Sequence, residues 1–502
     1  MAPTVAADGN NLFFPMILLL PLLLLILKHL RTSSSPPLPP GPSPLPILGN
    51  LLQMGNNPHV TLTHFAKTYG PLLKIKLGTQ LVVVGSSKEA AIEILKTHDR
   101  VLSGRLTPHA APTKSMELDG FQVGWVDECN DHWKYLRTIY KTELFSGRAM
   151  MESQAVAREK MVKDVVRLMN KMEGQVVQIR QVAFAAIFNM LGNVMVSRDV
   201  VNFEQESVEG VIGGPLRDLI EVGINISDLF PILARFDLQG LQRKCRDWFK
   251  KTCKIWEAII NERREMNMSN SSTQRDFLDA LIKNGSSNDQ INMLLQEIFT
   301  AGTDSSSSTI EWMMTELIRN PKYMKKVEEE IERETNQETV KDSHLLHLPF
   351  LQACFKETLR MHPPGPLLVP HRAVETCNVM NYTIPKNAQV MINFWAIGRD
   401  PKIWEDPLVF KPERFLNSSL DFKGNDFEYI PFSSGRRICP GLPMAAKHVP
   451  LLVACLVQFF DWSLPDGEDP DNVDMNEKYG FTLMKEQPLF LIPKPKKSEP
   501  YV

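Results

Sequence analysis

A ten-residue loop near the C-terminus constrains this chain more than any other stretch. The loop runs from Phe432 to Gly441 with the sequence FSSGRRICPG, and it places one cysteine, Cys439, among two glycines, two arginines and a proline. The apolar run that follows, GLPMAAKHVPLLVACLVQFF, predicts a long buried helix. The fold must therefore place the Cys439 thiol at the N-terminal end of this buried helix.

The surroundings of Cys439 favour a charged sulfur. Nearby positive charge and backbone N–H donors favour a thiolate, and a helix N-terminus offers such donors. Gly435 and Gly441 let the backbone approach a flat ligand closely, and Arg437 is placed to pair with an anionic carboxylate. We therefore predict that Cys439 is the single axial thiolate ligand of haem iron, the arrangement that favours O–O cleavage. The alternative is a buried structural cysteine.

Charge and cysteine usage exclude several other classes of protein. The 502 residues include 56 Lys+Arg against 58 Asp+Glu, so the formal net charge of -2 gives no electrostatic reason to expect nucleic acid as a partner. The seven cysteines are an odd number and are widely spaced, which predicts free thiols in a reducing compartment. With 43% hydrophobic residues, the chain has enough apolar material for a large core.

The N-terminal region predicts a membrane anchor followed by a stiff spacer. Gly9 to Leu27 is 19 residues without a charge, long enough to span a bilayer, and basic residues follow it rather than precede it. We expect residues 1–31 to be a single-pass anchor with the rest of the chain in the cytosol; the alternative is a cleaved signal peptide. Residues 32–50 contain seven prolines between positions 36 and 46 and predict an extended hinge that sets the attitude of the body to the membrane. The alternative for the hinge is a mere linker or a ligand for a proline-binding module.

Residues 51–502 predict one catalytic body that is mainly α with a small β portion. Amphipathic helices are expected at 158–172, 241–266, 289–319, 322–334 and 348–361, and a long helix after Cys439. Two hairpins are expected, one within 72–86 turning at Gly78-Thr79, and one within 377–398 turning at Pro385-Lys-Asn.

The helix at 289–319 carries a hydroxyl-rich stretch, FTAGTDSSSSTIEW. Gly302 and the six hydroxyl residues around it compete with the helical ladder, so the ladder can open there and admit water. Asp304 and Ser305 then supply an acid and a hydroxyl, the parts of a proton relay. The alternative is a plain solvated or kinked helix.

Two further short motifs combine charges. Glu357 and Arg360 lie three residues apart on a helix with apolar flanks, where they can meet. Arg414, in the sequence Pro-Glu-Arg-Phe, is expected to share the Glu357 carboxylate in a buried network. The alternative is an ordinary surface pair.

In this order, and over essentially the whole chain, these motifs resemble the cytochrome P450 family of haem-thiolate monooxygenases. The resemblance implies the cytochrome P450 fold, haem b, dioxygen, electrons from NADPH through NADPH-cytochrome P450 reductase, and the endoplasmic reticulum membrane. It implies roles for these residues: haem propionate contacts from Trp133, Arg137, Arg372 and Arg437; Phe432, Gly435 and Gly441 around the Cys439 ligand; a structural triad of Glu357, Arg360 and Arg414; and proton delivery by Asp304 and Ser305. Many relatives have threonine at the position of Ser305, and serine keeps the hydroxyl but loses the stiffness of a β-branched side chain.

More narrowly, the chain resembles plant microsomal enzymes that oxidise benzylisoquinoline alkaloids, a small-molecule substrate class. The resemblance rests on VLSGR (101–105), DLFPILARFDLQGLQRK (228–244), VPHRAVETCNVMNYTIPKN (369–387) and FLNSSLDFKGNDFEYIPF (415–432). It favours intramolecular C–C phenol coupling of a reticuline-like substrate, as by corytuberine synthase. The alternatives are aromatic 3'-hydroxylation of an N-methylcoclaurine-like substrate, C–O coupling as by berbamunine synthase, rearrangement of a tropane ester as by littorine mutase, and a haem-binding carrier or sensor without turnover.

The same resemblance places the substrate pocket and two charged surfaces. The pocket residues are Ala301, Leu367, Leu368, Val369, Phe481 and Thr482. Glu117, Asp119 and Asp304 are the candidates for pairing with a protonated substrate amine. Lys134, Arg137, Lys141 and Arg436 are the candidates for a basic reductase-docking patch, and a generic solvated face is the alternative.

Overall fold

The protein is described here by a computed structural model that covers residues 36–111, 120–201, 225–268 and 276–496. Within these ranges it is mainly helical with small sheets, as the sequence predicts. The longer helices are α2 (Pro58–Tyr69), α5 (Asp131–Ile139), α7 (Ser153–Lys171), α8 (Ile179–Val196), α11 (Leu241–Met268), α13 (Asn288–Arg319), α14 (Pro321–Thr335), α15 (Pro349–Met361) and α17 (Leu442–Phe459). The shorter helices are α3 (Lys88–Ile92), α6 (Gly147–Met151), α10 (Ile226–Leu229), α12 (Phe277–Lys283) and α16 (Phe394–Ile397).

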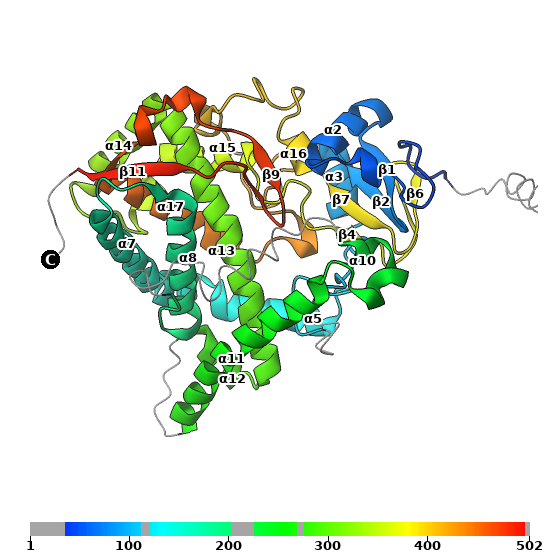
Figure 1. Cartoon of the computed structure of the whole chain (residues 1–502), viewed down its shortest axis with the longest axis horizontal. Helices are drawn as coiled ribbons and strands as arrows, with labels where there is room; N and C mark the ends of the chain where they lie inside the picture. Colours follow the sequence, from blue (N-terminus) through cyan, green and yellow to red (C-terminus); the bar gives the residue numbers. More distant parts are fainter. Residues whose placement is uncertain (1–35, 112–119, 202–224, 269–275, 497–502) are drawn as a thin grey trace, which may run out of the picture.

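Helix α13 is the central element, and Figure 1 shows it crossing the middle of the molecule. It begins where the Ser287 side chain accepts a hydrogen bond from the backbone N–H of Gln290, and it ends before Pro321, which opens α14. Helices α8, α11, α15 and α17 all pack against it. Because it is surrounded, α13 buries residues on nearly every side of its C-terminal half.

The hydroxyl-rich stretch does not interrupt this helix. Residues 288–319 form one continuous α-helix, which agrees with the alternative of a plain helix and not with an opened ladder. The hydroxyl groups donate to carbonyls one turn back instead: Ser305 Oγ to Ala301 O at 2.7 Å, and Thr309 Oγ1 to Ser305 O at 2.8 Å. Such bonds share a carbonyl with the ladder without breaking it, which explains why the stretch stays helical.

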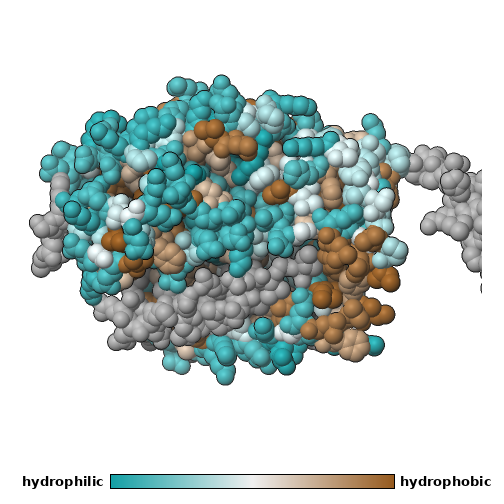
Figure 2. Space-filling view, turned by 45° about the horizontal axis from the view of Figure 1, so that its top comes forward, coloured by the Kyte–Doolittle hydropathy of each residue, from teal (hydrophilic) through white to brown (hydrophobic). Residues whose placement is uncertain are grey.

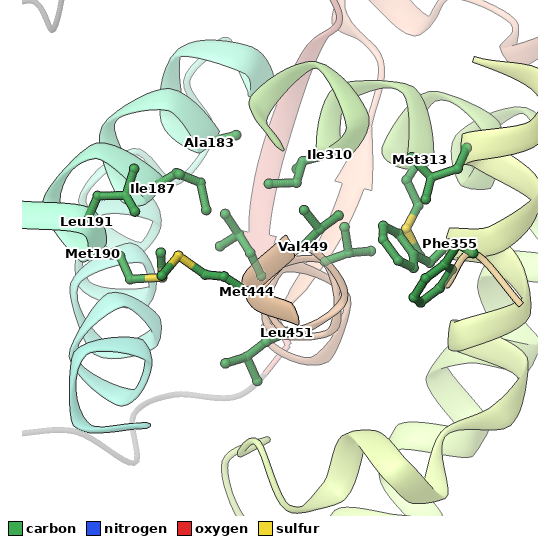
Figure 3. Packing of buried hydrophobic residues seen from close by; sticks show 14 of the residues in the cluster. Ala183, Ile187, Met190, Leu191, Ile310, Met313, Phe355, Met444, Val449 and Leu451 are labelled. Atoms are coloured by element: carbon green, nitrogen blue, oxygen red, sulfur yellow. The ribbon is translucent and has the colours of Figure 1, made fainter. Parts of the chain in front are cut away.

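The core lies between α8, α13, α15 and α17 (Figure 3). Side chains from these four helices meet in one cluster: Ala183, Ile187, Met190, Leu191, Ile310, Met313, Phe355, Met444, Val449 and Leu451. Helix α8 was not predicted, because it is apolar almost all round and so lacks the 3.6-residue periodicity of a surface helix. Among the described residues, α8 and α17 are long and apolar enough to cross a membrane. However, 78% of the residues of α8 and 61% of those of α17 are buried inside the protein, which is typical of core helices.

In the part of the chain that the structure describes, four small sheets make up the β portion. The largest has the order β1-β2-β7-β4, in which β1 (Leu72–Leu77) and β2 (Gln80–Gly85) form the predicted hairpin and β7 (Gln389–Ile392) pairs parallel to β2. The other strands are β3 (Val177–Gln178), β4 (His371–Arg372), β5 (Cys377–Val379), β6 (Tyr382–Ile384), β8 (Phe460–Ser463), β9 (Glu477–Tyr479), β10 (Leu483–Lys485) and β11 (Phe490–Pro495).

The second predicted hairpin turns at a different place. Strands β5 and β6 pair through a two-residue turn at Met380 and Asn381, whose φ angles of 49° and 65° fit a tight hairpin. A turn does form at Pro385-Lys-Asn, closed by the Ala388 N–H, which donates to Pro385 O at 3.1 Å. It leads from β6 into β7, which belongs to another sheet, so the prediction that this turn closes the hairpin was wrong.

The described part of the hinge lies on the body. The Lys74 N–H donates to Pro40 O at 2.8 Å, and the Thr383 N–H donates to Pro37 O at 2.9 Å. A Cβ atom at Gly41 would lie 1.9 Å from Lys74 O, so only glycine permits this approach. The proline-rich segment is thus tied to both β1 and β6, which fixes its direction relative to the body. The predicted anchor, residues 1–31, lies outside the described residues.

Candidate active site

The Cys439 loop is folded as the sequence predicts. The Cys439 N–H donates to Phe432 O at 3.0 Å, and Gly435 adopts φ 68° where a Cβ would lie 2.4 Å from Leu95 O. Burial raises the pKa of the Cys439 thiol, although backbone N–H groups of Gly441 and Leu442, at the start of α17, bond to the sulfur and act in the opposite direction. A metal ion bound to this sulfur would tip it to the thiolate, because metal ligation requires the deprotonated form.

Three arginines gather on one side of this thiol. Burial lowers the pKa of Arg105 to about 9, with a further contribution from neighbouring Arg437. Arg437 lies 4.9 Å from the ring centre of Trp133, and Arg137 lies 5.7 Å from the same ring. Among the described residues, Arg105, Arg137 and Arg437 have no carboxylate within 4.0 Å, and Glu297 acts on them only from a longer distance. They therefore form a positive cluster without a direct ion pair, buried at Arg105 and Arg437 and half-buried at Arg137.

Backbone carbonyls orient this cluster. Arg437 donates to the carbonyls of Ser103, Val123 and Val126 at 2.8 to 3.1 Å, and Trp133 Nε1 donates to Val123 O at 3.0 Å. Arg372, on β4, donates to Asn387 Oδ1 and Asp127 O, while its buried Nε has no partner among the described residues. The structure therefore brings together the four residues that the sequence assigned to propionate contacts.

This arrangement fits haem. A flat dianionic cofactor would supply negative charge to the arginine cluster and an iron to the sulfur. Arg105 belongs to the cluster although the sequence reasoning did not assign it a role. The signal was present in VLSGR, where an arginine follows directly on a small-residue turn.

The face of α13 that carries Ala301 and Ser305 is open. Ala301 is exposed and Ser305 is half-buried, although the next residues along the helix are buried. Asp304 is buried, with Oδ1 at 2.5 Å from Arg180 Nη2 and Oδ2 accepting a hydrogen bond from Thr482 Oγ1. The Asp304 carboxylate and the Ser305 hydroxyl, expected to work as a pair, thus have different partners in this structure.

The residues expected in the pocket divide into two groups. Phe481 is 50% exposed and Val369 is 42% exposed, whereas Leu367 is buried in the smaller cluster with Met54 and Leu62. Thr482 faces Asp304, and Leu368 packs on the main core with φ 50°, an unusual value for leucine. Leu367 thus packs in a separate cluster and Thr482 is hydrogen-bonded to Asp304, whereas Val369 and Phe481 are exposed.

The Glu357 network is buried, as expected, and not a surface pair. Arg360 Nε and Nη2 donate to the two Glu357 oxygens at 2.7 and 2.8 Å, and Arg414 Nε donates to Oε1 at 3.0 Å. Glu357 and Arg360 are both fully buried. The Lys411 N–H is a fourth donor to this carboxylate, at 2.8 Å.

The structure also reveals a carboxylate that the sequence reasoning missed. Glu297, on α13, accepts hydrogen bonds from the backbone N–H groups of Val123 and Gly124 and from the Tyr140 hydroxyl. A single glutamate on an amphipathic helix resembles a solvated residue, so no local signal distinguished it. Of the earlier amine-pairing candidates, Glu117 and Asp119 lie outside the described residues.

Comparison with known proteins agrees with this geometry. The sequence pattern that defines the cytochrome P450 family matches residues 39–492. A probable (S)-N-methylcoclaurine 3'-hydroxylase isozyme 2 of Coptis japonica is 48% identical over 95% of this chain and 97% of its own length. Corytuberine synthase of Coptis japonica is 44% identical over 91% of this chain and 94% of its own length. A zebra fish cytochrome P450 solved with progesterone is 23% identical, covers 87% of this chain and 99% of its own, and superposes with a TM-score of 0.75. From the cysteine loop, the arginine cluster and these matches together, we conclude that the chain belongs to the cytochrome P450 family.

Proposed function

We propose that this cytochrome P450 hydroxylates an aromatic ring of a benzylisoquinoline alkaloid. The observation that carries the proposal is the identity of 48% to two (S)-N-methylcoclaurine 3'-hydroxylases, from Coptis japonica and Papaver somniferum, over 95% and 92% of this chain. Both comparisons cover more than nine-tenths of this chain, so they bear on most of the catalytic body.

Phenol coupling, which the sequence reasoning favoured, is the second candidate. Corytuberine synthase at 44% and berbamunine synthase of Berberis stolonifera at 42% support it. Hydroxylation inserts one oxygen atom, whereas coupling only removes two electrons and two protons from the substrate. The two reactions use the same cofactor and differ in the pose of the substrate.

The residues of this chain divide the work as follows. As a cytochrome P450, the chain uses haem b, dioxygen and electrons from a reductase, and haem supplies the reductive activation of dioxygen. Cys439 would hold the iron, and Arg105, Arg137, Arg372 and Arg437 would hold the propionates.

The open face of α13 would bound the space for the substrate. The Ser305 hydroxyl is half-buried at this face, and Asp304 is held behind it by Arg180 and Thr482. We propose that Asp304 holds a proton source and that Ser305 presents a hydroxyl to the reacting atoms. For Asp304 to reach Ser305, its bond to Arg180 or Thr482 must open.

A membrane location is part of the proposal. Ile47, Leu52 and Ile232 are 79%, 70% and 78% exposed, and Figure 2 shows hydrophobic residues gathered at one end of the molecule. The segments that carry them meet at the β1–β2 turn, where Gly78 N–H donates to Leu48 O and Thr79 N–H donates to Leu229 O. Exposed apolar patches of this kind mark interaction surfaces, and an endoplasmic reticulum bilayer next to the hinge is the proposed partner.

We propose that the reductase docks on a basic surface of this chain, through a surface of its own that carries the opposite charge. Lys134 and Lys141 are exposed on and just after α5 and remain candidates for a basic patch, together with Arg436, which pairs with Asp99 at 2.7 Å. Arg137 lies against the Trp133 ring and belongs to the cofactor side instead. We propose NADPH-cytochrome P450 reductase as the electron donor.

Turnover under isotopically labelled dioxygen tests the reaction. The full chain, reconstituted with reductase and NADPH, is incubated with N-methylcoclaurine and, separately, with reticuline. A product of N-methylcoclaurine that carries one labelled oxygen supports hydroxylation. A reticuline product lighter by two hydrogen atoms and free of label contradicts it in favour of coupling, and no NADPH-dependent product from either amine would contradict both.

A further inference from the structure

Glu297 is held in a specific orientation by three donors. Its Oε2 accepts from Val123 N–H at 2.9 Å and from the Tyr140 hydroxyl at 3.3 Å, and its Oε1 accepts from Gly124 N–H. A Cβ atom at Gly124 would lie 2.5 Å from Oε1, so glycine is needed for the backbone to come this close. The carboxylate is therefore fixed between α13 and residues 123–124.

None of these three donors carries a positive charge. Among the described residues, no lysine, arginine or histidine nitrogen lies within 4.0 Å of Glu297. Burial raises the pKa of Glu297, and the backbone donors, Tyr140 and the more distant Arg105 act in the opposite direction. A carboxylate has about four lone-pair positions, so one position on Oε1 remains for a further donor.

The position of Glu297 on α13 directs it to the open face. Residues 297, 301 and 305 are four apart, so they lie along one side of the helix. Ala301 on this side is exposed, and Ser305 and Glu297 are half-buried. The negative charge therefore lies one helical turn from the residue expected to face the substrate.

The other described candidate for an amine partner is already engaged. Asp304 forms an ion pair with Arg180 at 2.5 Å and accepts a hydrogen bond from Thr482. Its charge is compensated by a direct ion pair, whereas Glu297 has no such pair among the described residues, its three donors are neutral, and Arg105 acts on it only from beyond 4.0 Å. A protonated amine that enters a desolvated site needs a counter-charge, because burying an unpaired ammonium is costly.

We propose that Glu297 is the specificity-determining residue that receives the protonated nitrogen of the alkaloid substrate, with residues 123–124 holding its carboxylate in place. The inference rests on the proposed function and specifies the charge of the substrate. The site should prefer a cationic amine over a neutral molecule of the same shape. The amine nitrogen donates to Oε1, and the aromatic rings extend along α13 toward Ala301.

Equilibrium binding to the haem-loaded full chain, followed by the spectral shift of the haem, tests the inference without turnover. Two ligands are compared: N-methylcoclaurine, whose amine is protonated at neutral pH, and its N-acyl analogue, whose amide nitrogen is not. Glu297→Gln is expected to weaken binding of the amine by at least about tenfold, the value of one charged hydrogen bond, and to change binding of the amide by less than about twofold.

Glu330→Gln provides a matched control. Glu330 on α14 is also a buried carboxylate that accepts from two backbone N–H groups, those of Phe350 and Leu351 at 2.8 and 2.9 Å, and burial raises its pKa as well. This variant should leave the amine-to-amide affinity ratio unchanged, which separates the loss of a charge at the site from the loss of a buried carboxylate elsewhere.

The outcomes are distinct. If Glu297→Gln weakens the amine and the amide equally, Glu297 only anchors residues 123–124 and the inference is overturned. If amine binding is unchanged, the inference is overturned as well. If the unmodified protein binds neither ligand, the proposed function fails and the inference falls with it.

Discussion

Replacing Glu357 with glutamine should destabilise the whole catalytic body. The glutamine keeps the size of the side chain but removes the charge that compensates Arg360, which is fully buried and has no other carboxylate within 4.0 Å among the described residues. Arg360 also donates to the carbonyls of Gly398 and Pro407, so it cannot turn toward solvent without breaking those bonds. The guanidinium is therefore left as an uncompensated buried charge.

The expected size follows from this burial. Breaking a buried ion pair by removing one partner costs about 3–5 kcal/mol in the free energy of unfolding. The entropy of unfolding is about 2.1 cal/mol/K per residue near 60 °C, or roughly 1 kcal/mol/K for this chain, so the unfolding midpoint should fall by about 3–5 °C. The same network links α15 to the turn at Pro412–Phe415, so haem retention should fall together with stability.

Asp131→Asn is the matched control. Asp131 and Lys134 also form an i,i+3 pair with an N–O distance of 2.8 Å, but their side chains are 97% and 61% exposed. Thermal unfolding followed by circular dichroism should therefore show no measurable change for this variant. A midpoint for Glu357→Gln within about 1 °C of the Asp131→Asn value would refute the argument that burial makes this pair strong.

Three further predictions concern single residues. For Glu477, burial raises the pKa, but hydrogen bonds from His362 and His59 and the charge of Arg399 outweigh it and hold the pKa well below its usual range; its stabilisation is thus fully present above about pH 4.3 and is lost as the pH falls below that value, so the stability deficit of Glu477→Gln in urea unfolding should stay constant from about pH 7 to about pH 5 and shrink between about pH 4 and about pH 2. Gly435→Ala should cost about 1–3 kcal/mol and lower haem content, measured by absorbance per protein, because φ is 68° and the new Cβ would meet Leu95 O; normal haem content would contradict this. Cys439→Ala should remove the red-shifted Soret band of the ferrous carbonyl adduct while leaving far-UV circular dichroism unchanged, and persistence of that band would exclude this thiolate as the ligand.

Sequence reasoning succeeded where the partners of a residue are close in the chain. The loop around Cys439 takes its glycines, its arginine and its helix N-terminus from ten consecutive residues, so its geometry follows from local rules. Glu357 and Arg360 are one helical turn apart, and their meeting follows from the helix itself. The end of α13 before Pro321 follows for the same reason.

It failed where the partner is remote or where the pattern is uniform. Asp304 pairs with Arg180, which is 124 positions away in the chain. No sequence periodicity in either segment predicts that contact. Helix α8 is apolar on nearly all sides, so its sequence lacks the alternation of apolar and polar faces by which a helix is recognised. The turn of the second hairpin was predicted at Pro385, because proline is a strong local turn signal. The observed β5–β6 turn uses Asn381 instead, a residue type that tolerates the left-handed conformation.

The two acidic residues Glu297 and Asp304 show how one helix can separate two tasks. They are seven positions apart, two turns of α13; Asp304 is buried and Glu297 is half-buried. Asp304 has a guanidinium partner, so its charge is neutralised locally and an incoming cation gains little from it. Glu297 has only neutral donors, so it retains a field that a cationic ligand can use. In this arrangement, exchanging Glu297 changes which ligands bind, whereas exchanging Asp304 removes the ion pair and the hydrogen bond by which Arg180 and Thr482 are joined to α13.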